Sequence, residues 1–123
     1  MKKAVFDSQQ NFIKVNFSGY PTLPEFQAVA NSILDVLQSS GSGKVLNDTT
    51  DLAVNSIEVQ EWTQREWFPK ATELGLKKFA FLVSKNIFGE VSAQQTNEKA
   101  EEEGAVNIKY FKAEEEAVSW LQA

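Results

Sequence analysis

The stretch Lys77-Lys78-Phe79-Ala80-Phe81-Leu82-Val83-Ser84 decides the fold of this chain. Its apolar part, residues 79–83, is the longest apolar run in the sequence. A strand with one solvated face alternates in polarity, whereas this run is apolar on both faces, which is typical of a strand buried inside a parallel sheet. We therefore predict a central strand here. A membrane span needs about 20 apolar residues, so none is expected.

Three strands and a helix are predicted on the amino-terminal side of this run. Residues 4–7 and 12–17 are short apolar stretches around a polar turn, which predicts an opening antiparallel hairpin. Thr22 and Glu25 have the spacing of a capping box, and the apolar residues after them recur at helical intervals, so a helix is expected at about 23–39. Residues 44–47 predict a brief buried strand.

Helices and strands alternate through the rest of the chain. Asn55 and Glu58 again have capping-box spacing, at the start of a long helical segment. Pro69 lies inside this segment, and because proline lacks an amide donor and clashes with the previous turn, we expect the helix to kink or restart there. The remaining predicted elements are a third helix at 92–104, a strand at 106–111 and a helix at 113–121. The order ββαβαβαβα predicts a single α/β domain, 1–123, with a mixed, mostly parallel sheet covered by helices.

The charges argue against one class of partner. The nine acidic and nine basic groups of residues 1–89 cancel, so the net charge of −5 arises after residue 89, chiefly at 101–103 and 114–116. Binding to a phosphate backbone requires clustered Lys and Arg, and the sequence has no basic stripe. We therefore expect no nucleic-acid partner.

Two missing residue types narrow the chemistry. The chain has no His and no Cys, which removes Ser-His and Cys-His nucleophiles, imidazole bases and the usual zinc ligands. Its glycines do not fit the spacing of a dinucleotide or Walker loop. We predict a non-catalytic protein without cofactor or metal. The lack of cysteine and of a signal-peptide core fits the cytoplasm.

The carboxyl ends of the predicted strands bring polar residues to one rim. Open α/β sheets bind ligands at this edge, where the free backbone N–H groups at helix N-termini bind an anion or a polar head group. Asp48 is placed to pair with Lys85, or to hold a hard cation together with Asp51, although turn chemistry explains the two aspartates more simply. The predicted rim consists of Asp48, Thr49, Ser84, Lys85 and Phe111.

Aromatic residues near Pro69 form the second part of the predicted site. At 100° per residue, Trp62 falls on the opposite side of the helix from Trp67, which leaves one tryptophan facing outward. A kink at Pro69 would open a groove lined by Trp62, Phe68 and Phe88. The alternative is that the kink rotates these rings into the core.

Several spaced strings give the chain a family resemblance. They are Leu46-Asn47-Asp48-Thr49, Trp67-Phe68-Pro69-Lys70-Ala71, Gly75-Leu76-Lys77-Lys78, Phe88-Gly89, Asn97-Glu98-Lys99, Glu101-Glu102-Glu103-Gly104 and Lys109-Tyr110-Phe111. With these strings the chain resembles a family of small bacterial STAS-like proteins, which are often grouped with CRAL-TRIO-type lipid-binding domains. The resemblance covers nearly the whole chain and implies a STAS-like fold.

The two better-known relatives of that family imply different functions. STAS domains act as phospho-switched protein partners, and the turn that carries their Asp-Ser-Ser/Thr-Gly switch offers here the hydroxyls of Thr49, Thr50 and Ser56. CRAL-TRIO domains hold apolar ligands. We therefore expect a protein-interaction module of STAS type; the alternative is a small carrier of an apolar ligand with a polar head group. A carrier needs an enclosed pocket of about 300 Å³ or more, whereas a partner surface is often flat.

The first predicted strand, 4–7, bears on the oligomeric state. It is expected at a sheet edge with few gatekeepers beyond Lys2, Lys3 and Asp7. Because an exposed edge invites pairing with another chain, a homodimer is an expectation from the sequence.

Overall fold

The structure is a computed structural model and describes residues 1–53, 55–88 and 106–123. The described strands form one five-stranded sheet, in the order in which they follow along the chain. The first pair is antiparallel and the others are parallel. The strands are β1 (Lys2–Asp7), β2 (Phe12–Gly19), β3 (Lys44–Leu52), β4 (Lys78–Leu82) and β5 (Asn107–Phe111). This arrangement confirms the predicted α/β class with a mixed, mostly parallel sheet.

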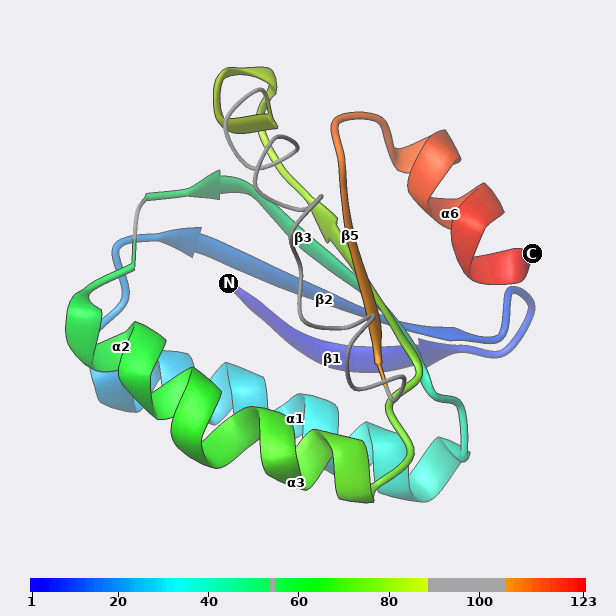
Figure 1. Cartoon of the computed structure of the whole chain (residues 1–123), viewed down its shortest axis with the longest axis horizontal. Coiled ribbons are helices and arrows are strands. Elements are labelled where there is room, and N and C mark those ends of the chain that lie inside the picture. Colours follow the sequence, from blue (N-terminus) through cyan, green and yellow to red (C-terminus); the bar gives the residue numbers. More distant parts are fainter. Residues whose placement is uncertain (54, 89–105) are drawn as a thin grey trace.

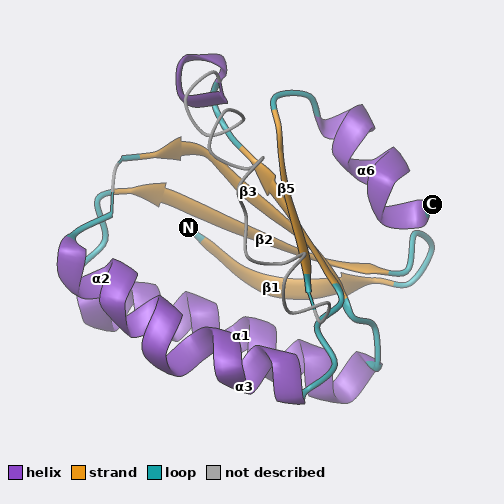
Figure 2. Ribbon diagram, in the orientation of Figure 1, coloured by secondary structure: helices purple, strands orange, loops and turns teal. Residues whose placement is uncertain are grey.

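The described helices cover the two faces of the sheet unequally (Figure 1 and Figure 2). One face carries α1 (Leu23–Ser40) and an unbroken helical run, 57–73, made of α2 (Ile57–Trp62), the π-helical turn η1 (Thr63–Trp67) and α3 (Phe68–Glu73). The other face carries α6 (Glu114–Gln122). The helix predicted at 92–104 lies outside the described residues. No helix in the described ranges is long and apolar enough to cross a membrane.

Helix α1 begins and ends where the sequence predicts. Thr22 Oγ1 accepts a hydrogen bond from Glu25 N at 3.3 Å, and Glu25 Oε1 accepts one from Thr22 N at 2.8 Å, which confirms the capping box. The backbone and side-chain hydrogen bonds from Thr22 lower the pKa of Glu25. Because the folded state favours the ionised carboxylate, this contribution to stability is present at neutral pH and is lost as the pH falls through the folded pKa.

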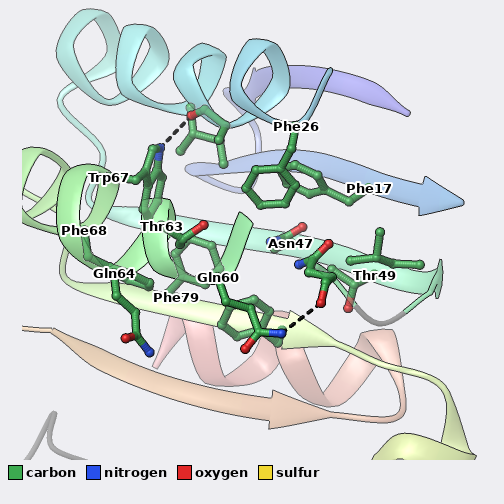
Figure 3. Close-up of a pocket in the computed structure, with 15 residues that line it drawn as sticks. Phe17, Phe26, Asn47, Thr49, Gln60, Thr63, Gln64, Trp67, Phe68 and Phe79 are labelled. Atoms are coloured by element: carbon green, nitrogen blue, oxygen red, sulfur yellow. Dashed lines mark hydrogen bonds between the residues drawn. The ribbon is translucent and has the colours of Figure 1, made fainter. Parts of the chain in front are cut away.

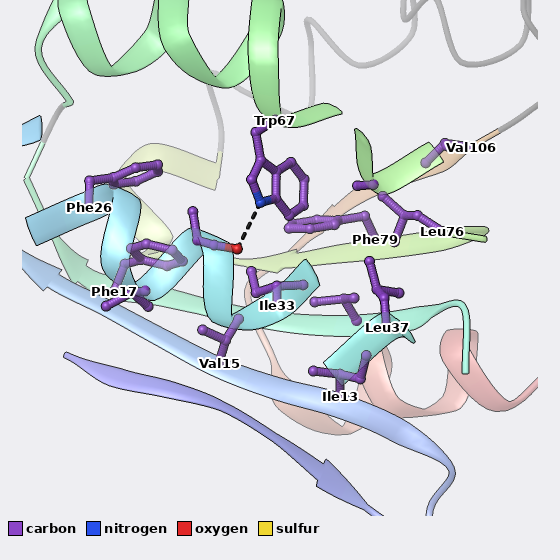
Figure 4. Packing of buried hydrophobic residues seen from close by; sticks show 14 of the residues in the cluster. Ile13, Val15, Phe17, Phe26, Ile33, Leu37, Trp67, Leu76, Phe79 and Val106 are labelled. Atoms are coloured by element: carbon purple, nitrogen blue, oxygen red, sulfur yellow. Dashed lines mark hydrogen bonds between the residues drawn. The ribbon is translucent and has the colours of Figure 1, made fainter. Parts of the chain in front are cut away.

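Residues of β4 alternate between two cores. Phe79 packs into the larger core between the sheet and the helices α1, α2, η1 and α3, whereas Ala80 and Leu82 belong to the smaller core beneath α6. Figure 4 shows the larger core, with Trp67 inserted between the helical run and α1. This alternation confirms that β4 is buried on both faces. β4 is an interior strand, although β3 holds the middle position of the sheet.

Strand β3 is longer than predicted. The sequence places a strand end at residue 47 because 48–51 are turn-forming residues, but that boundary is wrong and the strand continues through all four of them. The register with β2 shifts at this place, so β3 holds one extra residue. Asp48 Oδ1 accepts hydrogen bonds from Thr50 N at 3.0 Å and Thr50 Oγ1 at 2.7 Å. The expected turn chemistry is thus present inside a β-bulge.

Strand β1 forms an edge of the sheet that is partly blunted. Its register with β2 shifts between Lys2 and Val5. At the irregularity, Ala4 N donates a hydrogen bond to Ser32 Oγ of α1 at 2.9 Å. A bulge and a covered amide both interrupt the ladder that a second chain would extend. The predicted homodimer stays a prediction, and continuous pairing along β1 would have to remove these features.

The helical run 57–73 contains a π turn just before Pro69, where the sequence predicts a kink or a restart. The run does not break there. In η1 the backbone N–H of Phe68 donates to the carbonyl of Thr63, five residues earlier. Pro69 then lies in the first turn of α3. A proline ring crowds the carbonyl four residues before it in a regular α-helix, and a wider π turn accommodates it without a gap.

Candidate functional site: a pocket between the helical run and the sheet

A pocket of about 210 Å³ lies between the helical run 57–73, α1 and the inner strands (Figure 3). One part of its wall consists of aromatic and aliphatic side chains, and the other consists of uncharged polar side chains. None of the described lining residues has an ionisable side chain. They are Phe17, Phe26, Ala30, Ile33, Asn47, Thr49, Leu52, Asn55, Gln60, Thr63, Gln64, Trp67, Phe68, Phe79 and Phe81.

Trp67 fixes the apolar wall. Its side chain is 3% exposed, and its Nε1–H donates to the Ala30 carbonyl of α1 at 2.8 Å. Its ring meets the rings of Phe68 and Phe79 edge to face, with centroids 5.0 and 5.7 Å apart. One indole therefore connects α1, the helical run and β4, which sets the spacing between the helices and the sheet at the pocket.

The π turn supplies much of the polar wall. Thr63 and Gln64 lie in η1, and Gln60 precedes them by about one turn. Gln60 and Gln64 are exposed, so they mark the mouth of the pocket. Thr63 Oγ1 donates to the Val59 carbonyl at 2.8 Å. Single π turns are frequent at functional sites because the extra residue redirects side chains.

Asn47 is a buried polar residue of the pocket whose hydrogen-bonding capacity is not fully used. It lies within β3 and is 5% exposed, yet its Oδ1 has no hydrogen-bond partner among the described residues. Oδ1 of Asn55 is likewise buried without a partner there. Leaving a buried acceptor unpaired costs roughly 1 to 3 kcal/mol, and such groups are uncommon in folded proteins. The fold retains two of them beside one cavity.

We expect Asn47→Leu to raise the free energy of unfolding by about 1 kcal/mol. The substitution keeps the approximate shape of the side chain and removes the unpaired amide from the interior. Urea unfolding followed by circular dichroism measures the change. Asn107→Leu, at the exposed start of β5, is the matched control and should stay within about 0.5 kcal/mol of wild type. A loss of stability in Asn47→Leu would mean that Asn47 supports the fold.

Strand pairing brings the backbones of the predicted rim residues close together, but their side chains do not form one site. Asp48 pairs in register with Leu82, which pairs with Phe111. The side chains then diverge: Thr49 lines the pocket, whereas Phe111 is buried in the other core beneath α6. Ser84 and Lys85 follow β4, where Lys85 is exposed in a helical turn at 85–88. Of the five predicted rim residues, Thr49 alone is a lining residue of this pocket.

The structure places the three aromatic residues of the predicted groove, Trp62, Phe68 and Phe88, in different surroundings, so a shared groove stays a prediction. Phe68 lines the pocket, but Trp62 packs edge to face on Phe26, with centroids 6.2 Å apart, and borders a separate surface groove. The ring of Phe88 lies elsewhere, with Lys112 Nζ 5.4 Å from its centroid. The helical run continues through Pro69 without a break, and Phe68 and Trp62 line different pockets among the described residues.

The three candidate phosphorylation hydroxyls all have structural roles. Thr49 is 8% exposed and donates to the Leu82 carbonyl at 2.9 Å. Thr50 donates to Asp48 Oδ1 at 2.7 Å. Ser56 Oγ caps α2 by accepting from the amide of the third helical residue at 3.2 Å, so the cap lies one residue later than the predicted Asn55. Phosphorylation at these positions stays a prediction.

Sequence reasoning missed Asn47, Thr63 and Gln64 as pocket residues. A signal for Asn47 is present, because it follows the apolar pair Val45 and Leu46 and alternates with Val45 on one face of the strand. An amide at such a position points into the core. Thr63 and Gln64 carry no comparable signal, because their placement depends on the π turn.

Known proteins add no identification. Comparison of the sequence with models of protein families found no match, and a search of curated proteins found none either. The resemblance to STAS-like proteins therefore stays a prediction based on the strings quoted above. Within the described ranges, no group of three acidic side chains is arranged to hold a metal ion.

Proposed function

We propose that this protein is a non-catalytic binding domain that carries a small apolar molecule with a polar group in the pocket between the helical run 57–73 and the sheet. The observation that carries this proposal is the buried Oδ1 of Asn47, which has no partner among the described residues, in a cavity with one largely aromatic and one uncharged polar wall. It corresponds to the carrier that the sequence offered as the alternative to a protein-interaction module.

The size of the pocket supports a small ligand and not a lipid. Its volume of about 210 Å³ is below the roughly 300 Å³ expected above for a carrier and below the range of about 300 to 1,000 Å³ that holds drug-sized molecules, so the proposed ligand is smaller than either size implies. An engineered apolar cavity of about 150 Å³ holds benzene. By that comparison, the pocket accommodates a ring system of roughly eight or nine non-hydrogen atoms.

The chemistry of the wall supports binding without turnover. General acid–base catalysis requires a titratable group within hydrogen-bond reach of the reacting atom. The described lining residues offer amides, hydroxyls and rings, but no carboxylate, lysine or tyrosine. The proposal that the protein is not an enzyme rests on this wall and on the absence of His and Cys from the chain.

Native mass spectrometry of protein purified from its source, combined with a variant that fills the pocket, tests this function. We expect a small mass to accompany the wild type and to be lost from Thr63→Phe, because the ring occupies the pocket. Thr72→Phe is the matched control: Thr72 lies on the same helical run and also donates to a main-chain carbonyl, at 2.9 Å, but it does not line the pocket. A mass retained by Thr63→Phe would contradict the location of the site.

A protein-interaction module remains the second candidate, and two exposed side chains favour it. Tyr20 is 68% exposed just after β2, and Ile57 is 73% exposed at the start of α2. Large apolar side chains left in solvent mark contact surfaces when they gather in a patch. In the same mass spectra, a stoichiometric protein partner without any small mass would favour this candidate over the carrier.

A further inference from the structure

We infer that the ligand of this pocket is an uncharged, planar ring compound with an N–H or O–H donor, and that Asn47 accepts the hydrogen bond. The inference rests on the proposed function and specifies the chemistry of its ligand. It follows from which polar atoms of the pocket are already used and which are not.

In the described part of the chain, the fully buried side-chain polar atoms without a partner are both acceptors. Oδ1 of Asn47 and Oδ1 of Asn55 are buried without a partner among the described residues. Asn47 is fixed within β3, where its backbone pairs with Val15 on one side and Phe81 on the other, so the strand cannot easily turn the side chain out to solvent. A ligand donor supplies the hydrogen bond that the described fold leaves unmade.

Three neighbouring donors are already committed. The hydroxyl groups of Thr49 and Thr63 and the amide nitrogen of Gln60 each donate to a main-chain carbonyl, at 2.8 to 2.9 Å. A hydroxyl that donates elsewhere retains only its capacity to accept. Figure 3 shows Asn47, Thr49 and Gln60 towards one end of the pocket and Trp67 and Phe68 towards the other. The polar end is therefore suited to a ligand that donates.

The charge and the shape of the pocket wall restrict the class of ligand further. The described wall has no cationic side chain that would balance a carboxylate or phosphate, and an anion would meet acceptor oxygens. The apolar wall is made largely of ring faces and edges, including the Phe17–Phe26 pair with centroids 4.6 Å apart. Flat aromatic molecules pack best against such surfaces, by offset stacking or edge-to-face contact.

The test is an NMR titration of ¹⁵N-labelled protein with indole, benzofuran and benzoate. Indole and benzofuran have nearly the same shape, but indole has a ring N–H donor and benzofuran has a ring oxygen acceptor. We expect indole to shift the Trp67 Nε1–H signal and to bind about tenfold more tightly than benzofuran, since a satisfied buried acceptor is worth roughly that ratio. Benzoate should leave the pocket signals unchanged.

Substitutions test whether the Asn47 side chain causes the preference for indole over benzofuran. In Asn47→Leu the ratio of indole to benzofuran affinity should fall to about one, whereas Asn107→Leu should retain the wild-type ratio. Asn55→Leu tests the second acceptor, should reduce the ratio to a smaller extent, and provides a readout if Asn47→Leu does not fold.

The outcomes separate this inference from the proposed function. Equal binding of indole and benzofuran, with shifts at pocket residues, would overturn the donor requirement and leave the pocket as a binding site. Tighter binding of benzofuran would mean that Asn47 presents its NH₂ group, which also overturns the inference. An absence of pocket shifts with all three probes would overturn both proposals.

Discussion

Replacing Trp67 with alanine is expected to lower the free energy of unfolding by about 3 to 5 kcal/mol, the usual range for a large aromatic side chain removed from a core. The side chain is 3% exposed and contacts three separate elements. Its removal leaves a cavity between α1, the helical run and β4, and it also removes the hydrogen bond to the Ala30 carbonyl. Urea unfolding followed by far-ultraviolet circular dichroism measures the loss.

Two further variants show which property of Trp67 matters. Trp67→Phe keeps most of the apolar surface but has no N–H donor, so an intermediate loss is expected. Trp62→Ala removes the same side chain from a half-buried position on the same helical run, and it should cost less than half as much. Equal losses for Trp62→Ala and Trp67→Ala would show that Trp67 does not hold the helical layer to the sheet.

Gly43→Ala is expected to lower the free energy of unfolding by about 2 to 3 kcal/mol, in the upper part of the range for overpacking. A Cβ at this position would overlap the carbonyl oxygen of Gly75 and lie 3.2 Å from Lys77 N. Both opposing atoms belong to the main chain. The segments cannot separate easily, because the Gly43 carbonyl accepts hydrogen bonds from the amides of Lys77 and Lys78, at 2.7 and 3.0 Å.

A nearby glycine provides the control for Gly43→Ala. Gly41 has a φ of 72° and has open space where its Cβ would lie. Asparagine tolerates this left-handed conformation, so Gly41→Asn should change the stability by less than about 0.5 kcal/mol. The same urea experiment measures both variants. A Gly43→Ala protein as stable as Gly41→Asn would contradict the close approach of the two segments.

The parts of the fold that follow from local chemistry were predictable from the sequence. Thr22 and Glu25 place the start of α1 because a capping box satisfies its own backbone groups. The run 79–83 predicts a strand buried on both faces because neither face has polar residues, and β4 lies between β3 and β5. In both cases the deciding interactions lie within a few residues of each other.

The parts that depend on distant contacts were not predictable. Residues 48–51 favour a turn locally, but pairing with β2 and β4 holds them in β3 and leaves the turn chemistry as a bulge. The position of Phe111 at a strand end suggested a rim, but strand pleating directs its side chain towards α6. The side on which a side chain emerges depends on register, which the sequence alone did not determine.

The candidate site, too, was predictable only in part, because its side chains come from distant parts of the sequence. Thr49 and Phe68 were predicted and do line the pocket, although Thr49 lies inside β3 and not at a strand end. The groove predicted for Trp62 and Phe88 requires a kink at Pro69, whereas the helical run passes this proline through a π turn without a break. The sequence predicts Asn47 only as part of a strand, although an amide on the same strand face as Val45 is a sign of a polar site in the core.

The π turn also allows the lining of the pocket to change without a change in the fold. A π turn holds one residue more than the α turn it replaces, so a chain shorter by one residue between 63 and 67 would keep an unbroken helix. Because the extra residue is contained within that one turn, the residues before and after it would keep their relative orientation. Val59, Trp67 and Ala71 would keep their contacts with the core, but the turn would have one side chain fewer to direct towards the cavity. A change in length at this one turn therefore alters what the pocket accepts while the architecture around it is inherited intact.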